Sequence, residues 1–169
     1  ICDMRVDRLA QFESQYPNAR KTADLQAVLG DGDIDAVIVA TPANTHFEIA
    51  RAALLADKHV MVEKPLAQTA TQCRELITLA QKHKRILMSG HVFIYNPAVQ
   101  KIKEYIESGL LGQIHYVYSQ RLNLGIIRQD VNALWNFAPH DLSIINYWLG
   151  TGPTHVTARG YDYIQPGIE

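Results

Sequence analysis

Residues 35–46 read D-A-V-I-V-A-T-P-A-N-T-H, an apolar run that gives way abruptly to turn-forming and polar residues. After Asp35 the run is apolar without interruption as far as residue 40 and contains β-branched side chains. Such a run is typical of a strand buried on both faces, as in a parallel sheet covered by helices. Residues 59–62 and 86–89 are two further runs of this kind. We therefore predict adjacent parallel strands over these three runs.

The segments between these runs have the patterns of amphipathic helices. Thr22 is placed to cap a helix that ends at Gly30, and Thr45 and Glu48 have the spacing of a capping box. Residues 69–83 are predicted to form another helix. Strands that alternate with helices predict an α/β fold, here half of a doubly wound Rossmann-type parallel sheet. The apolar stripe of the last helix consists of Cys73, Leu76, Ile77 and Ala80.

The pattern changes near residues 91–97, and we place a domain boundary there. Residues 1–95 would form a dinucleotide-binding domain, and residues 96–169 would form a second domain of mixed α and β structure. Asn96 and Pro97 are the residue types preferred at the cap and at the first position of a helix. A new helix is therefore expected to open the second domain.

Further elements of the second domain follow from alternation and helical spacing. Residues 114–124 alternate in the manner of a strand, and residues 155–163 read as another strand. Residues 138–149 are predicted to be a helix that ends at Gly150. Its inward face is predicted to carry Leu142, Ile145 and Leu149.

Composition excludes several classes of protein. The chain has 169 residues, of which 47% are hydrophobic and 20% charged, with a formal net charge of -1, so no nucleic-acid partner is expected. Cys2 and Cys73 form no C-x-x-C pair, so neither a disulfide framework nor a metal site is expected, and a reducing cytoplasm fits best. No apolar run approaches the roughly 18 residues of a membrane span. The first residues lack the apolar region of a signal peptide.

Polar residues follow each predicted strand. Residues 41–46, residues 63–65 and the pair Gly90-His91 come directly after the three apolar runs. In open parallel sheets, ligands bind beyond the carboxyl ends of the strands. A loop that leads into a helix also presents free N–H groups, which suit a phosphate or an amide. Any one of these loops alone could be a simple turn, but three at one edge favour a binding site.

Glu63-Lys64-Pro65 is the most informative of these loops. Burial just beyond a strand would lower the pKa of Lys64, so that its amine could bind a substrate hydroxyl and help take its proton. Glu63 would offer a counter-charge or an acceptor for cofactor groups. A strand-end salt bridge followed by a turn is an equally good interpretation of the triplet by itself.

Two further places could contribute to a site. Asn136 and His140 are four residues apart and would share a helix face, where His140 could transfer a proton, although a structural histidine is the commoner case. Asp3 follows a possible strand end, where an acidic residue can accept hydrogen bonds from a ribose. The chain has no G-x-G-x-x-G turn ahead of Asp3, and a helix N-cap explains this residue equally well.

Taken in order, Thr41-Pro42-x-x-x-His46, Glu63-Lys64-Pro65 and the pair His140-Asp141 resemble the glucose-fructose oxidoreductase/inositol dehydrogenase (Gfo/Idh/MocA) family. The resemblance implies a Rossmann domain followed by a domain with an open, mostly antiparallel sheet, which commonly carries the subunit contact. It implies NAD or NADP as cofactor and a sugar, polyol or related hydroxyl compound as substrate. It also implies a cis peptide bond before Pro65.

The resemblance assigns roles to individual residues. Lys64 and His140 fall on the active-site lysine and histidine, and Asp3 falls on the ribose-binding acid. Asp3 would repel a 2′-phosphate and so favours NAD, although Arg5 nearby weakens this preference. The family often has Asp where this chain has Asn136, which cannot act as a base, so a Lys64–His140 pair would carry proton transfer. The cofactor loops would contain Thr41, Pro42, Asn44, His46 and Glu63, with Asn96 and Pro97 near the nicotinamide.

These observations predict an NAD(P)-dependent dehydrogenase acting on CH–OH, homo-oligomeric when complete. The missing glycine-rich turn and the short second domain make the chain look like a fragment of roughly half a subunit. A non-catalytic regulatory or scaffold protein on the same fold is the alternative, which Asn136 keeps open, since fold does not determine function. A fragment that is inactive alone is a third possibility.

Overall fold

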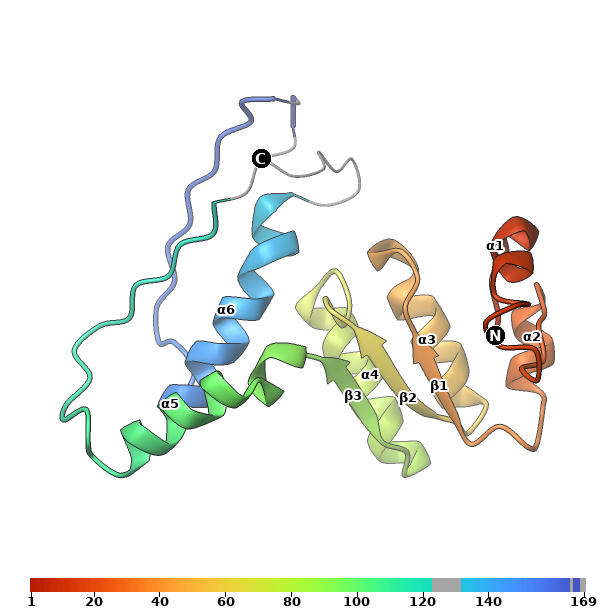
Figure 1. The fold of residues 1–169 in the computed structure, drawn as a ribbon, viewed down its shortest axis with the longest axis horizontal. Helices are drawn as coiled ribbons and strands as arrows, with labels where there is room; N and C mark the ends of the chain where they lie inside the picture. The colour runs from red at the N-terminus through yellow and green to blue at the C-terminus, as the bar shows by residue number, and fades with distance from the viewer. Residues whose placement is uncertain (123–131, 165, 168–169) are drawn as a thin grey trace.

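The computed structural model describes residues 1–122, 132–164 and 166–167. Its centre is a parallel sheet of three strands in the order β1 (Ala36–Val39), β2 (His59–Glu63) and β3 (Leu87–Gly90), as Figure 1 shows. The register pairs Val39 with Val62 and Glu63 with Gly90. The carboxyl ends of all three strands therefore meet at one edge, which confirms the prediction of adjacent parallel strands.

The core lies on one face of this sheet. Helices α3 (His46–Leu55) and α4 (Ala70–His83) cover that face and pack against each other (Figure 1). Leu54 and Leu76 are both 0% exposed at this interface. The same cluster includes Val39, Ala50, Ala53, Val60, Val62 and Ala80.

The opposite face of the sheet is open. Ile38 is aligned with Met61, and Met61 with Met88, so these side chains form a row across the strands. Ile38 is 69% exposed, and Met88 is also exposed. The prediction that the strands are buried on both faces is therefore wrong for this chain. Helices α3 and α4 cover only the face that carries Val39, Val60 and Val62.

The N-terminal segment forms helices α1 (Val6–Gln11) and α2 (Leu25–Leu29). Cys2 makes a single parallel bridge with Thr22. Contrary to the prediction, Thr22 does not cap α2. Its hydroxyl accepts a hydrogen bond from the backbone N–H of Asp24 at 3.0 Å, and the Asp24 side chain in turn accepts from Gln26 N.

The start of α3 tests a further cap prediction, and α4 has a cap that was not predicted. The capping box at Thr45 does not form, because the Thr45 hydroxyl donates to the Pro42 carbonyl at 2.7 Å within the turn η1 (Ala43–Thr45). The Thr69 side chain caps α4 by accepting from Gln72 N at 3.2 Å, at the start of the helix predicted over residues 69–83. In the predicted stripe of α4, Leu76 and Ala80 are buried, whereas Ile77 is exposed.

The second half contains helices α5 (Pro97–Glu107) and α6 (Ala133–Leu149) after the turn η2 (Val92–Tyr95). The Asn96 side chain caps α5, as predicted, by accepting from Ala98 N at 2.9 Å. The Trp148 indole N–H donates to the carbonyl of Val99 at 2.9 Å and ties α6 to α5. Among the described residues, no helix is both long and apolar enough to cross a membrane.

Helix α6 differs from its prediction in length and in facing. It begins at Ala133 rather than at residue 138, because the Asn132 side chain caps it by accepting from Trp135 N at 2.9 Å. Ile144 is its buried residue, whereas Leu142 and Leu149 are exposed. Packing against η2 and α5 determines which face of α6 is buried. The spacing of its leucines is not enough to predict that face.

The two strands predicted in the second half are absent from the described residues. Residues 114–122 and 155–163 have no strand structure, and Tyr116 and Tyr118 are exposed. Residues 123–124 of the first prediction lie outside the described residues. A strand forms only where a neighbour pairs its backbone groups, and among the described residues neither segment takes part in such pairing. The domain boundary remains a prediction.

The core predicts a specific mutational cost. Leu54→Ala removes a side chain that is 0% exposed between α3 and the sheet. We expect the free energy of unfolding in urea to fall by about 2–5 kcal/mol, from lost burial and the cavity left behind. Leu142→Ala is the matched control, because Leu142 is exposed on α6. Equal losses in the two variants would contradict this description of the core.

Candidate functional site

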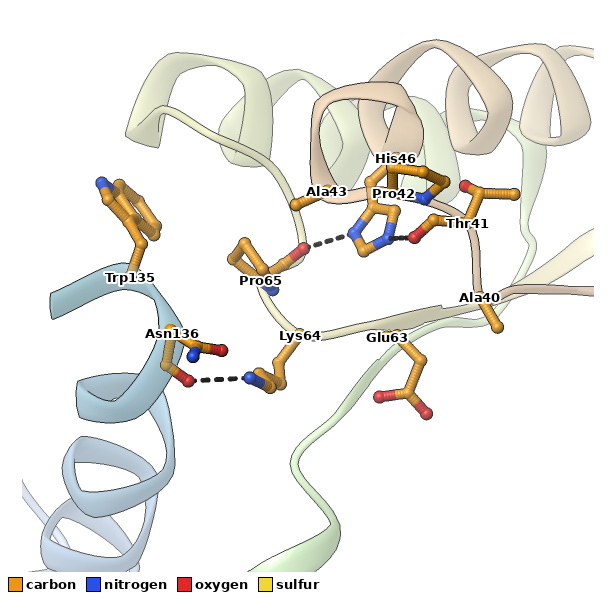
Figure 2. A pocket seen from close by; sticks show the side chains of 10 residues that line it. All are labelled: Ala40, Thr41, Pro42, Ala43, His46, Glu63, Lys64, Pro65, Trp135 and Asn136. Atoms are coloured by element: carbon orange, nitrogen blue, oxygen red, sulfur yellow. Dashed lines mark hydrogen bonds between the residues drawn. The ribbon is translucent and has the colours of Figure 1, made fainter. Parts of the chain in front are cut away.

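A cavity of about 220 Å³ lies at the carboxyl edge of the sheet. The loops after β1 and β2 form two of its walls, and the first turn of α6 closes a third side (Figure 2). The structure thus brings together segments that are far apart in the chain. The lining residues are Ala40, Thr41, Pro42, Ala43, His46, Glu63, Lys64, Pro65, Trp135 and Asn136.

Lys64 lies at the centre of this arrangement. The Lys64–Pro65 peptide bond is cis, as the family resemblance implied. The Lys64 Nζ donates to the backbone carbonyl of Asn136 at 2.8 Å (Figure 2). The loop after β2 thus contacts α6 through the backbone of Asn136 and not through its side chain.

His46 is almost completely enclosed, with 1% of its surface exposed. Its Nδ1 is 2.7 Å from the carbonyl oxygen of Pro65, and its Nε2 is 2.8 Å from that of Thr41. Figure 2 shows the ring lying between these two loops. The polar atoms of His46 therefore face the protein backbone, although the residue forms part of the cavity wall.

Glu63 lies against the end of the neighbouring strand. A Cβ atom added at Gly90 would come within 3.0 Å of Glu63 Oε2 and 3.3 Å of Glu63 Cα. A residue with a Cβ at this point of β3 would require Glu63 to shift by a few tenths of an ångström. The Gly90 backbone thus helps to determine where the Glu63 side chain sits at the edge of the sheet.

His140 lies one helical turn beyond Asn136 on α6, in mid-helix and not at the helix start as predicted. Its Nδ1 is buried and has no hydrogen-bond partner among the described residues. The Phe93 ring meets its imidazole edge-on, with ring centroids 4.7 Å apart. Burial lowers the pKa of His140, and the positive charge of Lys64 lowers that pKa further. A neutral imidazole beside a lysine can accept a proton near neutral pH.

Further charged and titratable groups lie near His140. Arg121 makes a two-point ion pair with Asp141, with Nε–Oδ2 and NH2–Oδ1 distances of 2.7 and 3.0 Å. The hydrogen bond from Arg121 lowers the pKa of Asp141. At the end of β3, the Ser89 hydroxyl and the His91 Nδ1 are buried without partners among the described residues. Burial lowers the pKa of His91.

Sequence reasoning missed some of these contributors. Trp135 lines the cavity directly before Asn136, and the predicted helix start at residue 138 had placed it in a loop. A cap at Asn132 was the local signal that would have extended the helix to include it. Arg121 lies 20 residues before its partner Asp141, and no local pattern links the two.

Some residues expected at the site lie outside the cavity lining. Asn44 is exposed on η1, and the Asn96 side chain is used as the cap of α5, with Pro97 next to it. Asp3 follows the residue that bridges to Thr22. One Asp3 carboxylate oxygen accepts the backbone N–H of Arg5 at 2.8 Å. The N-cap of α1 is Arg5, so the alternative interpretation of Asp3 as an N-cap does not hold.

Known proteins resemble both the sequence and this arrangement. Myo-inositol 2-dehydrogenase of Thermotoga maritima is 28% identical over 95% of this chain and 49% of its own length. Levoglucosan dehydrogenase, solved in complex with NADH and levoglucosan, superposes with a TM-score of 0.73 at 28% identity, over 88% of this chain and 44% of that one.

The WlbA dehydrogenase of Bordetella pertussis, solved with NADH and UDP-GlcNAcA, has a TM-score of 0.75 at 25% identity, over 90% of this chain and 47% of that one. The chain spans about half the length of the curated relatives it matches. A family model for oxidoreductases with an NAD-binding Rossmann fold matches residues 1–91 of the 169. The chain therefore belongs to the Gfo/Idh/MocA oxidoreductase family.

Proposed function

We propose that this chain is part of an enzyme that transfers a hydride between a nicotinamide cofactor and a hydroxyl-bearing carbon of a sugar or polyol. The observation that carries the proposal is the cavity in which Lys64 contacts α6. His140, whose pKa is lowered, lies one turn further along that helix. Relatives that act on inositol and levoglucosan support the substrate class.

The residues at this edge fit the nicotinamide end of the cofactor. Pro42, Ala43 and Pro65 offer apolar surface for a flat ring, and the nearby buried Nδ1 of His140 has no partner among the described residues. A cavity of about 220 Å³ is smaller than the roughly 300–1,000 Å³ of pockets that enclose whole ligands. It would therefore hold one end of a dinucleotide. When bound, the cofactor supplies the hydride acceptor or donor.

The residues of the chain itself would handle the proton and the position of the substrate. Lys64, held at Asn136, would bind the reacting hydroxyl and stabilise negative charge on its oxygen. His140 would accept the hydroxyl proton in the oxidative direction and return it in the reductive direction. Asn136 lacks a carboxylate, so this pair would carry the transfer together.

The preference for NAD over NADP belongs to this proposal as well. The Asp3 carboxylate would repel a 2′-phosphate at the ribose, although Arg5 next to it would offset part of that repulsion. The alternative function, a regulatory or scaffold protein that binds the cofactor without turnover, is favoured only by Asn136. Turnover by the complete protein on a panel of sugars and polyols separates the two.

Binding by the isolated chain provides one test. The sequence contains no G-x-G-x-x-G turn, which normally supplies the pyrophosphate contacts at a helix N-terminus. Calorimetry with NAD should therefore detect very weak binding or none. A micromolar dissociation constant would show that the remaining loops suffice, and would overturn this account of the phosphate site.

Kinetics of the complete protein provide a second test. Lys64→Ala and His140→Ala should each lower kcat by roughly 10²–10⁴-fold, the usual contribution of a general acid–base group. The double variant should lose much less than the product of the two factors, because both groups serve one proton transfer. Lys101→Ala, on the exposed face of α5, is the control. If Lys64→Ala kept full kcat, Lys64 would have no catalytic role and would be only a structural residue at the end of a strand.

The electrostatics of His140 can be measured directly. Its NMR titration midpoint should lie below the ordinary value of 6.5, because burial and the Lys64 charge both disfavour the protonated ring. Lys64→Met removes one of these causes, so the pKa of His140 should rise, whereas Lys101→Met should leave it unchanged. A fall in the Lys64→Met variant would contradict the arrangement described here.

A further inference from the structure

We propose that His46 is the positioning residue of the site: its Nδ1–H donates to the Pro65 carbonyl and thereby holds the backbone that carries Lys64. The inference rests on the role proposed above for Lys64. It assigns His46 to the protein framework and not to the cofactor contacts.

Burial and geometry support this assignment. His46 is 1% exposed, and both ring nitrogens lie within hydrogen-bond distance of backbone carbonyls, at 2.7 Å from Pro65 O and 2.8 Å from Thr41 O. Buried carbonyl groups need donors, and a neutral imidazole carries a single N–H that can serve one of these two. In the proposed role that N–H lies on Nδ1 and serves the Pro65 carbonyl. Both ring nitrogens of His46 therefore face the protein and not a ligand.

The contacts of the two ring nitrogens, called here the Pro65 arm and the Thr41 arm, have different consequences. Pro65 follows Lys64 directly, so a bond to the Pro65 carbonyl restrains the backbone from which the lysine extends. At its other end the lysine is held by the carbonyl of Asn136 at 2.8 Å. Lys64 is therefore restrained through the backbone that follows it and through its own amine. The Nε2 arm reaches only Thr41, on the opposite wall of the cavity.

A single position of the ring also sets the distance between two walls of the cavity. His46 is the first residue of α3, and the loop after β1 leads into that helix. The ring bridges from this loop to the loop after β2, as Figure 2 shows. Misplacement of a reacting group by about 1 Å can cost on the order of 10²-fold in rate. Loss of the hydrogen bond between His46 and the Pro65 carbonyl should therefore lower kcat.

Two substitutions separate the arms. The amide nitrogen of an asparagine side chain takes roughly the place of Nδ1, and that of a glutamine roughly the place of Nε2. In the complete protein we expect His46→Gln to lower kcat about 10²-fold with little change in the KM for cofactor, and His46→Asn to keep most of the activity. His155→Gln, at an exposed histidine, is the matched control. Rates are compared per folded molecule.

A second readout does not depend on catalysis. With ¹³C-labelled lysine in the chain without cofactor, the Lys64 ε-carbon signal should move toward that of exposed lysines in His46→Gln but not in His46→Asn. If the protein proves to have no dehydrogenase activity, the proposed function fails, but this signal still decides the present inference. Equal shifts in the two variants, or none in either, would overturn it.

The unsubstituted protein supplies the final check if either variant fails to fold. Imidazole ¹⁵N spectra should show a proton on Nδ1 of His46, slow to exchange with solvent because the ring is buried. A ring protonated on Nε2 alone could donate only to Thr41 and would leave the Pro65 carbonyl without this donor. That result would refute the role of His46 in positioning Lys64.

Discussion

The parallel register of β1, β2 and β3 is the constraint on which the rest of the structure depends. Because Val39 pairs with Val62 and Glu63 with Gly90, the chain leaves all three strands at the same edge. Loops of quite different sequence are thereby brought within reach of one another. The hydrophobic contact of α3 and α4 with one face holds this register, since a slip by one residue would turn the buried valines to the open face.

The cavity is completed by a segment that lies far from the sheet in sequence. Lys64 and Asn136 are 72 residues apart, yet one hydrogen bond joins them. Helix α6 reaches this position because it packs on η2 and α5, which follow β3 directly. The same packing buries one side of His140 against Phe93 and so lowers its pKa. Position and chemistry at the site thus have a common origin in this packing.

Much of the fold could be predicted because it depends on neighbouring residues. The apolar runs, the helix over residues 69–83 and the Asn96-Pro97 helix start each involve groups a few residues apart, and all are found. The Thr45 capping box failed because its hydroxyl found a competing acceptor, the carbonyl of Pro42. The predicted strands of the second half failed for another reason: alternation shows that a segment could form a strand, but pairing needs a neighbour in space.

The sequence by itself determined the parallel strands, the loops at their ends and the family, because these are recorded in local patterns and in the order of motifs. Only the tertiary structure decided that His46 faces two backbone carbonyls, that Lys64 contacts the backbone of Asn136, and that α6 buries Ile144. A hydrogen bond or a buried face depends on where a distant segment comes to rest. Residue type restricts the possible partners, but packing selects among them.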